Sequence, residues 1–359
     1  MLRRTVVILA VLTLLLTVGI WTAGSAYAAN PCTAEQGQLL IDSGQYTQAV
    51  AEFTCVIDTE PTGVEGYRGR IEAALLLGQF SNAVGDYARV TALVLPAHPD
   101  AQATILAGYK ARLKAAPQNV HALTGASFAH WWFFEYPQAI HQANRLLNIQ
   151  PNNLYGNLFR GSSRLLHGSN KAKGTEDLER ALALAPQSAD VRFIVADAYT
   201  YGQPEPQRAL AEATLALNWG LDTPRVHAIL GSAYLALGDQ SAAAFHIHRH
   251  IDLVTTELVN GPGIGAGTSQ QLSLVPGRTY ELPLPATAGE TISVLTSSDD
   301  FYDSILVLLA PDGSPVVGGD DYDAYFAGFE WVAGVTGTYR LWVTSFESVS
   351  SGDLVVIRD

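Results

Sequence analysis

The stretch "SGQYTQAVAEFTCVIDTEP" (residues 43–61) returns in altered form as "LGQFSNAVGDYARVTALVLP" (residues 77–96). In both stretches Gly-Gln-aromatic is followed at matching positions by an alanine, a second aromatic residue and an apolar residue, and each stretch closes with a proline. The spacing from Ala49 through Phe53 to Val56 is i, i+4, i+7, which places three side chains on one helix face. A glycine supplies the turn before that helix, and a proline ends it. The two stretches therefore predict a repeated helical unit.

The same pattern returns in the stretches that begin near residues 136, 174, 207 and 231. Pro61 and Pro96 lie 35 residues apart, as do Pro151 and Pro186. The pattern resembles the tetratricopeptide repeat (TPR), a helix–turn–helix unit of about 34 residues. The resemblance covers about residues 30–254, in some six units, and implies an all-α solenoid, which we bound at 30–257. It also implies that the concave face holds a protein or peptide partner.

One predicted helix does not fit the repeat. It lies between Pro99 and Pro117 and has no obvious partner in the sequence. We therefore expect an irregular unit or an insertion in this region.

The N-terminus has the order of a secretory signal. Two arginines precede the apolar run "TVVILAVLTLLLTVGIW" (residues 5–21), and small residues follow it up to Ala28. We expect a signal peptide over residues 1–28 and an exported protein: periplasmic, cell-surface or secreted. The alternative is an uncleaved anchor, since the run approaches the length that spans a bilayer. Only in that case do we expect the membrane as a partner.

Two cysteines occur in the sequence, Cys32 and Cys55. Export permits a disulfide, and the predicted pairing of helices could bring the two residues together. We therefore expect a disulfide between them. The alternative is two small buried apolar side chains.

The stretch "FAHWWFFEY" (residues 128–136) is the most aromatic part of the predicted solenoid. Phe128, Trp131 and Trp132 are candidate partner-binding residues, because their helix would point them partly toward the concave face, where exposed aromatic side chains bind partners. The interpretation that we favour is that they pack inside, against the helix of residues 99–117, because aromatic residues at helical spacing are more often core. A second cluster, "HIHRH" (residues 246–250), has two histidines at i, i+4, but two ligands do not define a metal site, and we expect an ordinary final helix.

The composition changes at "NGPGIGAGTSQ" (residues 260–270), which is typical of a linker and which we bound at 258–268. Beyond it, apolar and polar residues alternate with period two between turn residues. This predicts an all-β sandwich over 269–359. The expected strands are residues 270–275, 279–284, 290–297, 303–310, 314–317, 326–333, 338–345 and 353–358.

The order of features in this last third resembles the bacterial pre-peptidase C-terminal (PPC) domain. The features are an aspartate before "DSILVLLAPDG", a Gly-rich turn, the pair Asp320-Asp321, an aromatic strand and a closing "GTYRLWV". The resemblance covers about residues 265–359. It implies a small jelly-roll-like sandwich of secreted proteins, some of which bind calcium.

Five aspartates could gather at one end of this sandwich: Asp300, Asp303, Asp320, Asp321 and Asp323. Calcium takes six to eight oxygen ligands, which clustered carboxylates and loop carbonyls can supply. We therefore expect calcium as a candidate cofactor. The alternative is that these aspartates accept hydrogen bonds from turn N–H groups or are simply solvated.

The charge balance narrows the class of function. The sequence has 34 acidic and 21 basic residues, a formal net charge of −13, which argues against binding to nucleic acid. It contains no G-x-S-x-G, H-E-x-x-H or P-loop motif. We predict an exported, non-catalytic protein-interaction adaptor. The alternative is a sandwich that binds an extracellular polymer or glycan through Tyr322, Tyr325 and Trp331, with the solenoid as a spacer.

Overall fold

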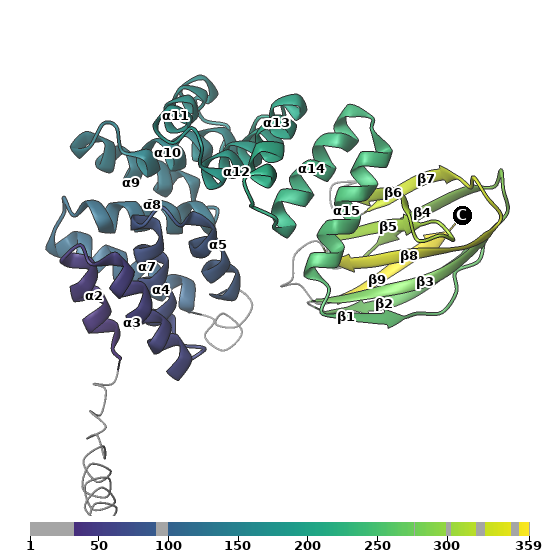
Figure 1. Ribbon diagram of the computed structural model, residues 1–359, viewed down its shortest axis with the longest axis horizontal. Helices are drawn as coiled ribbons and strands as arrows, with labels where there is room; N and C mark the ends of the chain where they lie inside the picture. Colours follow the sequence, from purple (N-terminus) through teal and green to yellow (C-terminus); the bar gives the residue numbers. More distant parts are fainter. Residues whose placement is uncertain are drawn as a thin grey trace, which may run out of the picture.

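The computed structural model describes residues 32–90, 100–275, 277–298, 303–320, 327–345 and 352–358. A curved array of helices comes first in the chain, and a β-sandwich follows it (Figure 1). The predicted signal segment, residues 1–28, lies outside the described residues.

Within residues 34–89 and within residues 101–254, successive helices are joined by short turns and pack on their neighbours in sequence. They are α2 (Ala34–Asp42), α3 (Tyr46–Thr59), α4 (Val64–Leu76), α5 (Phe80–Arg89), α7 (Ala101–Ala115), α8 (Val120–Trp132), α9 (Tyr136–Ile149), α10 (Leu154–Leu166), α11 (Lys171–Leu184), α12 (Ala189–Asp197), the π-helix η2 (Ala198–Gly202), α13 (Pro206–Asn218), α14 (Pro224–Leu237) and α15 (Gln240–Val254). The predicted solenoid is therefore confirmed as a fold.

The repeat motif works through close contact between helices. Phe53, on α3, is fully buried, and its ring lies where a Cβ atom on Gly37 or on Gly69 would fall, at 2.6 Å and 2.0 Å respectively. Glycine at these two positions lets α2 and α4 close on the ring from both sides. Phe53 is thus the wedge between the first unit and the second.

The unpaired helix of the sequence is α7. It packs against α4 and α8. Its Arg112 binds the buried carboxylate of Glu72, on α4, at 2.5 Å, and Tyr109 lies against Gly125 of α8. Among the described residues, α7 therefore joins two units that it does not itself belong to.

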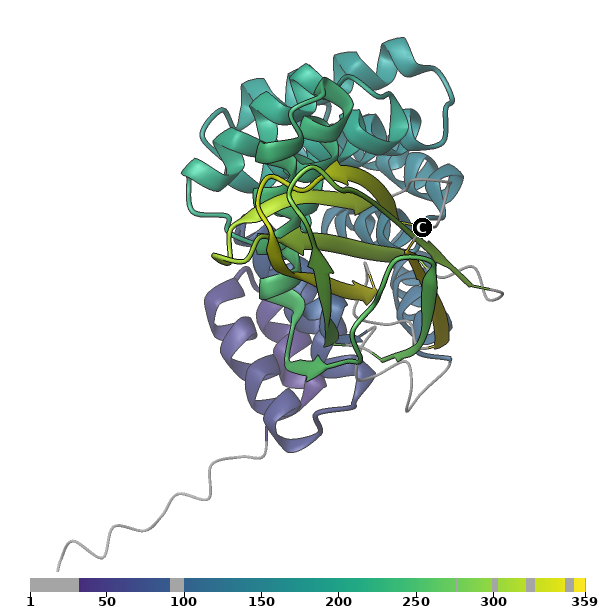
Figure 2. The same ribbon diagram turned by 90° about the vertical axis from the view of Figure 1, so that its right-hand side faces the viewer.

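The sandwich has two sheets among the described residues. One has the order β1-β3-β8-β5-β6 and the other the order β2-β9-β4-β7. All pairs are antiparallel except β1 with β3. The strands are β1 (Glu257–Asn260), β2 (Thr268–Leu274), β3 (Arg278–Ala286), β4 (Thr291–Ser297), β5 (Ser304–Leu309), β6 (Pro315–Asp320), β7 (Gly328–Val332), β8 (Gly337–Ser345) and β9 (Gly352–Arg358). Each of the eight expected strands is present. Figure 2 views the chain with these strands in front of the helices.

The segment expected to be a linker, residues 258–268, is instead part of the sandwich. Residues 257–260 form β1, which pairs with β3, and the side chain of Ile264 is fully buried in the sandwich core. The glycines let the backbone lie close to β3: a Cβ on Gly261 would fall 2.3 Å from Leu282. The linker prediction was wrong because glycine-rich sequence can indicate either a flexible backbone or a backbone packed closely against a neighbour, and here it is the second.

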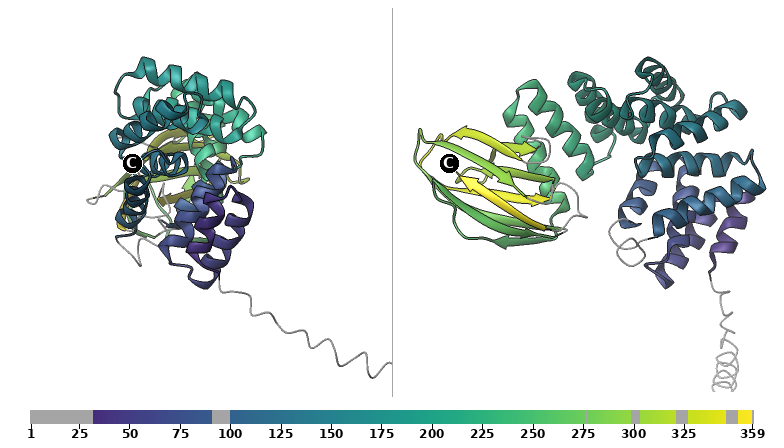
Figure 3. Two further views of the ribbon diagram at one scale, coloured as in Figure 1. Left: turned by 90° about the vertical axis from the view of Figure 1, so that its left-hand side faces the viewer. Right: turned by 180° about the vertical axis from the view of Figure 1, so that it is seen from behind.

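Helix α15 packs on the outer face of the first sheet, against β5 and β6 (Figures 1 and 3). Strand β5 is buried along its whole length, with Leu306 in the sandwich core and Ile305 and Val307 in a separate apolar cluster. In that cluster they meet Ile247 and Ile251 of α15. A solenoid needs its last helix covered or polar, and here the sandwich covers it.

The contact between α15 and β6 gives a test of this joint. A Cβ on Gly318 would lie 2.8 Å from the side chain of Ile247. We expect Gly318→Val to lower the free energy of unfolding by about 1–3 kcal/mol, because the joint is overpacked. Urea denaturation of the full chain measures this. The control is Gly334→Val, since a Cβ there would meet nothing within 4 Å; an equal loss in both variants would contradict the close joint.

Candidate partner-binding surface

The three aromatic residues predicted to bind a partner lie on α8. Phe128 is fully buried, Trp131 is 7% exposed and Trp132 is partly buried. Phe128 stacks on Phe159 of α10 with ring centres 5.2 Å apart, and the Trp131 Nε1–H donates to Ser162 Oγ at 2.9 Å. The candidate role as exposed binding residues is therefore wrong for Phe128 and Trp131, because α8 and α10 pack through them. A binding role for Trp132 remains a prediction.

The exposed aromatic residue of this region is Phe134, in the turn between α8 and α9, with 70% of its surface accessible. Its φ is +59°, in the left-handed region. The corresponding turns of other units place glycine there: Gly44, Gly78, Gly168 and Gly238, with φ from 73° to 80°. A left-handed conformation costs a residue with a side chain about 1 kcal/mol.

Backbone hydrogen bonds show that Phe134 occupies the same position in its turn as Gly44 does in the turn after α2. The N–H of Phe134 donates to the carbonyl of Trp131, and the N–H of Glu135 donates to that of His130. The N–H groups of Gly44 and of the residue after it donate to the matching carbonyls at the end of α2. This helix-ending motif requires a left-handed residue, for which glycine is the usual choice. Phe134 therefore occupies a glycine position.

Phe134 adjoins a small group of aromatic and charged side chains. Its ring meets Tyr136 edge-on at 6.2 Å. Burial raises the pKa of Tyr136 to about 12, with the charge of Asp197 adding to the effect and that of Arg225 opposing it. The phenol therefore stays neutral and can donate a hydrogen bond.

The charged part of this group continues onto η2 and α14. Arg225 lies over the ring of Tyr201 at 4.6 Å and pairs with Asp197 at 3.1 Å. Tyr201 is 38% exposed and sits in η2, a π-helical turn that continues α12. Such turns are frequent at functional sites. We call Phe134, Tyr136, Tyr201 and Arg225 the aromatic patch.

The predicted calcium ligands lie mostly outside the described residues, as Asp300, Asp321 and Asp323 do. Asp303 precedes β5 and Asp320 ends β6. Asp320 is paired with Ile305 in the sheet register, so these two aspartates belong to the same end of the sheet. Across the described ranges, no three His, Cys, Asp or Glu side chains gather as metal ligands. Calcium binding remains a prediction.

The two histidines of the "HIHRH" stretch do not converge on a common site. His246 contacts His227, and His250 contacts the carbonyl of Pro224. Trp331 is partly buried against the sandwich core. Tyr322 and Tyr325 lie outside the described residues.

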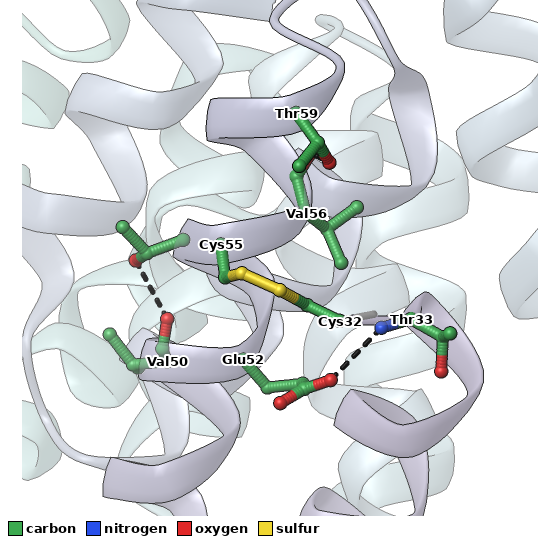
Figure 4. The surroundings of a disulfide bond; sticks show 8 residues. Cys32, Thr33, Val50, Glu52, Cys55, Val56 and Thr59 are labelled. Carbon is green, nitrogen blue, oxygen red and sulfur yellow. Dashed lines mark hydrogen bonds between the residues drawn. A yellow bond between two sulfur atoms is a disulfide. The ribbon is translucent and has the colours of Figure 1, made fainter. Parts of the chain in front are cut away.

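The expected disulfide is present. Cys32 and Cys55 are bonded, with Cα atoms 5.9 Å apart, and the bond fastens the start of α2 to α3 (Figure 4). Beside it, the N–H of Thr33 donates to the carboxylate of Glu52 at 2.9 Å. The bond thus holds the first unit, whose apolar cluster is separate from the main core.

No family model matches the sequence, and no curated protein matches it. Solved structures do resemble parts of the chain. The PPC domain of a collagenase from Bacillus anthracis is 15% identical, with a TM-score of 0.25, and the match covers 28% of this chain and 94% of that one.

Two of the matching structures are TPR proteins. One, from Parabacteroides merdae, is 16% identical with a TM-score of 0.37, over 63% of this chain and 80% of that one. The other, from Thermus thermophilus, is 20% identical with a TM-score of 0.34, over 57% and 98%. Both resemblances drawn from the sequence are thus found among solved structures.

No helix in the described part of the chain is long and apolar enough to cross a bilayer.

The disulfide gives a second test. Replacing Cys32 and Cys55 by serine should destabilise the first unit by about 3 kcal/mol, because a closed loop of this length restricts the unfolded chain. Urea unfolding followed by circular dichroism measures the loss. Reductant should have the same effect on the wild type and none on the double variant, since the sequence has 2 cysteines. A wild type unaffected by reductant would contradict a stabilising bond.

Proposed function

We propose that this chain is an exported, non-catalytic adaptor whose solenoid binds a protein segment at the aromatic patch. The observation that carries the proposal is Phe134, an exposed aromatic side chain on a left-handed backbone where four other turns have glycine. Strain that persists where glycine would remove it points to a function of the side chain. The signal-like N-terminus and the disulfide support export to an oxidising compartment.

The chemistry of the patch suits a protein partner. Aromatic residues and arginine dominate the binding energy of protein interfaces, since they bury a large area and keep a polar group at its edge. Phe134 and Tyr201 offer accessible rings, and Tyr136 adds a neutral hydroxyl. Arg225 and Asp197 neutralise one another, so a partner does not have to bury an uncompensated charge there.

Substitution of Phe134 separates binding from folding. Phe134→Gly should raise the free energy of unfolding by about 0.5–1 kcal/mol, because it relieves the left-handed strain, and should weaken partner binding at least about tenfold. Phe134→Ala should lose the binding without the gain in stability. A photo-crosslinking residue at position 134 identifies the partner in the exporting host, and titration of the purified partner measures the affinity.

The matched control is Val335→Ala, which truncates an exposed apolar residue of the sandwich and should leave the affinity unchanged. Unaltered affinity in both Phe134 variants would exclude the patch as the binding surface.

We also propose that calcium orders the acidic end of the sandwich. From residue 262 onward the sequence has thirteen acidic and three basic residues, a net charge of −10. A cation near Asp303 and Asp320 would relieve part of this repulsion.

The melting temperature of the full chain in calcium and in chelator tests this. A ligand at one hundred times its Kd stabilises the folded state by about 2.7 kcal/mol, so we expect a higher second transition in millimolar calcium. Asp303→Asn should abolish the rise, whereas Asp239→Asn, in the turn between two helices, should not. Identical melting in calcium and chelator would leave the aspartates as turn residues.

A further inference from the structure

Histidines gather where the solenoid meets the sandwich. Of the 9 histidines in the sequence, four lie on the last two helices: His227 on α14, and His246, His248 and His250 on α15. Histidine is the side chain whose ordinary pKa lies closest to neutral pH. The two sides of α15 therefore differ in how they respond to acid.

The side of α15 that faces the sandwich is apolar. Ala244, Ile247 and Ile251 pack there against Ile305 and Val307 of β5, in a cluster that also includes Ala228 of α14. At its border, His248 lies 5.0 Å from the ring of Trp342. The groups facing His248 are Arg340 on β8, with Arg249 and Asp252 on its own helix, and burial is the main cause that lowers its pKa.

The side of α15 that faces α14 is fastened by histidines. The Nδ1 atoms of His227 and His246 are 2.8 Å apart, and the His250 Nδ1–H donates to the carbonyl of Pro224 at 2.9 Å. His227 and His250 are each 3% exposed. These contacts connect α15 to the first turn of α14.

The hydrogen bonds fix which nitrogens carry protons. His227 Nε2 lies 2.8 Å from the carboxylate of Asp222, which can only accept. His227 Nδ1 is therefore the acceptor in its contact with His246, and His246 donates. A proton on His227 alone can still be shared, since neutral His246 can accept at Nδ1, but when both rings are protonated two N–H groups face each other and the contact breaks.

The surroundings also disfavour a charge on His246. Its ring is stacked on Tyr234 and meets Phe245 edge-on. The nearby carboxylates are already paired, because Arg249 binds both Asp222 and Asp252. Burial, with a smaller effect of His227, lowers the pKa of His246 to about 4. Burial also lowers the pKa of His227, although Asp222 acts in the opposite sense.

We propose that the contact between α14 and α15 is an acid-sensitive clasp, which opens when His227 and His246 become protonated, so that the sandwich leaves the solenoid together with α15. The apolar contact of α15 with β5 contains no pair of histidines and stays intact. The turn at Gly238, with φ +80°, is the hinge between the two helices.

The direction of the pH dependence follows from linkage. Above pH 6.5 His227 and His246 are neutral whether the clasp is open or closed, so pH does not change the balance between the two forms. Below pH 6.5 the exposed histidines of the open form take up protons that the closed form resists, and the closed form is progressively lost toward pH 4. Because His246 is only partly buried, we expect opening to increase about tenfold, rather than by the full amount, between pH 7.5 and 5.0.

A cysteine at Ala243 reports the opening directly. Ala243 is fully buried on α15, its backbone lies beside Gly231 of α14, and the native cysteines are bonded and do not react. Labelling of Ala243→Cys in the full chain by a dithiodipyridine, normalised to an exposed Ala183→Cys at each pH, should become about tenfold faster at pH 5.0 than at 7.5. An unchanged normalised rate would overturn the proposal.

Further substitutions decide where the chain opens. In the Ala243→Cys background, His246→Gln and His246→Phe should each remove most of the acceleration. Two substitutions are used so that the test still holds if one of the variants folds poorly. Exposed His141→Gln should keep the acceleration. Circular dichroism at pH 5.0 should retain its helical signal, because the clasp opens without unfolding. Acceleration that survives both His246 variants, disappears instead in His248→Gln, or accompanies a loss of helix would overturn the clasp.

Discussion

The solenoid depends on the burial of one apolar face per helical unit, which a single unit cannot achieve alone. Between the first two units the wedge is Phe53, and Gly69 is the small residue that makes room for it. Such a stack has two ends with no further unit to cover them. One end is held by the disulfide at Cys32, and the other is covered by the sandwich through Ile305 and Val307. The β-domain is thus part of what keeps the last helix in place.

Ion pairs between paired helices complement this apolar packing. Arg70 binds Asp86, Arg160 binds Asp177, and Arg192 binds Glu212, in each case from the first helix of a unit to the second. These acidic residues are largely buried. Buried pairs of this kind contribute little net stability, but removing one partner is costly. They oppose any sliding of one helix along the other.

Most of the fold could be predicted from the sequence, because repeat period and strand alternation are local signals. The sequence predicted the helical units, the eight strands and the disulfide. It misjudged Phe128 and Trp131 as candidate binding residues, since periodicity places a side chain on a helix face but does not show what covers that face. It also misread residues 258–268, because glycine permits both a flexible linker and close packing against Leu282.

Two missed features had a signal in the sequence. The run "ILVLL" (residues 305–309) is apolar at every position, which indicates a strand buried on both faces and hence the contact with α15. Phe134 aligns with Gly44 when the two turns are compared, so the unusual residue could have been recognised. The π-helical turn at η2 and the contact of His227 with His246 depend on packing between units, and no local pattern predicts them.

The proposed binding surface and the proposed clasp meet in the first turn of α14. Arg225 belongs to the aromatic patch, and His227, two residues later, contacts α15 through His246. The carbonyl of Pro224, just before Arg225, accepts the hydrogen bond from His250. A partner that immobilises Arg225 therefore also restricts the helical turn that carries His227. Coupling between two sites is reciprocal in free energy. If protonation moves this turn and so changes the affinity of the patch, binding of the partner must change the proton affinity of the histidine pair by the same factor.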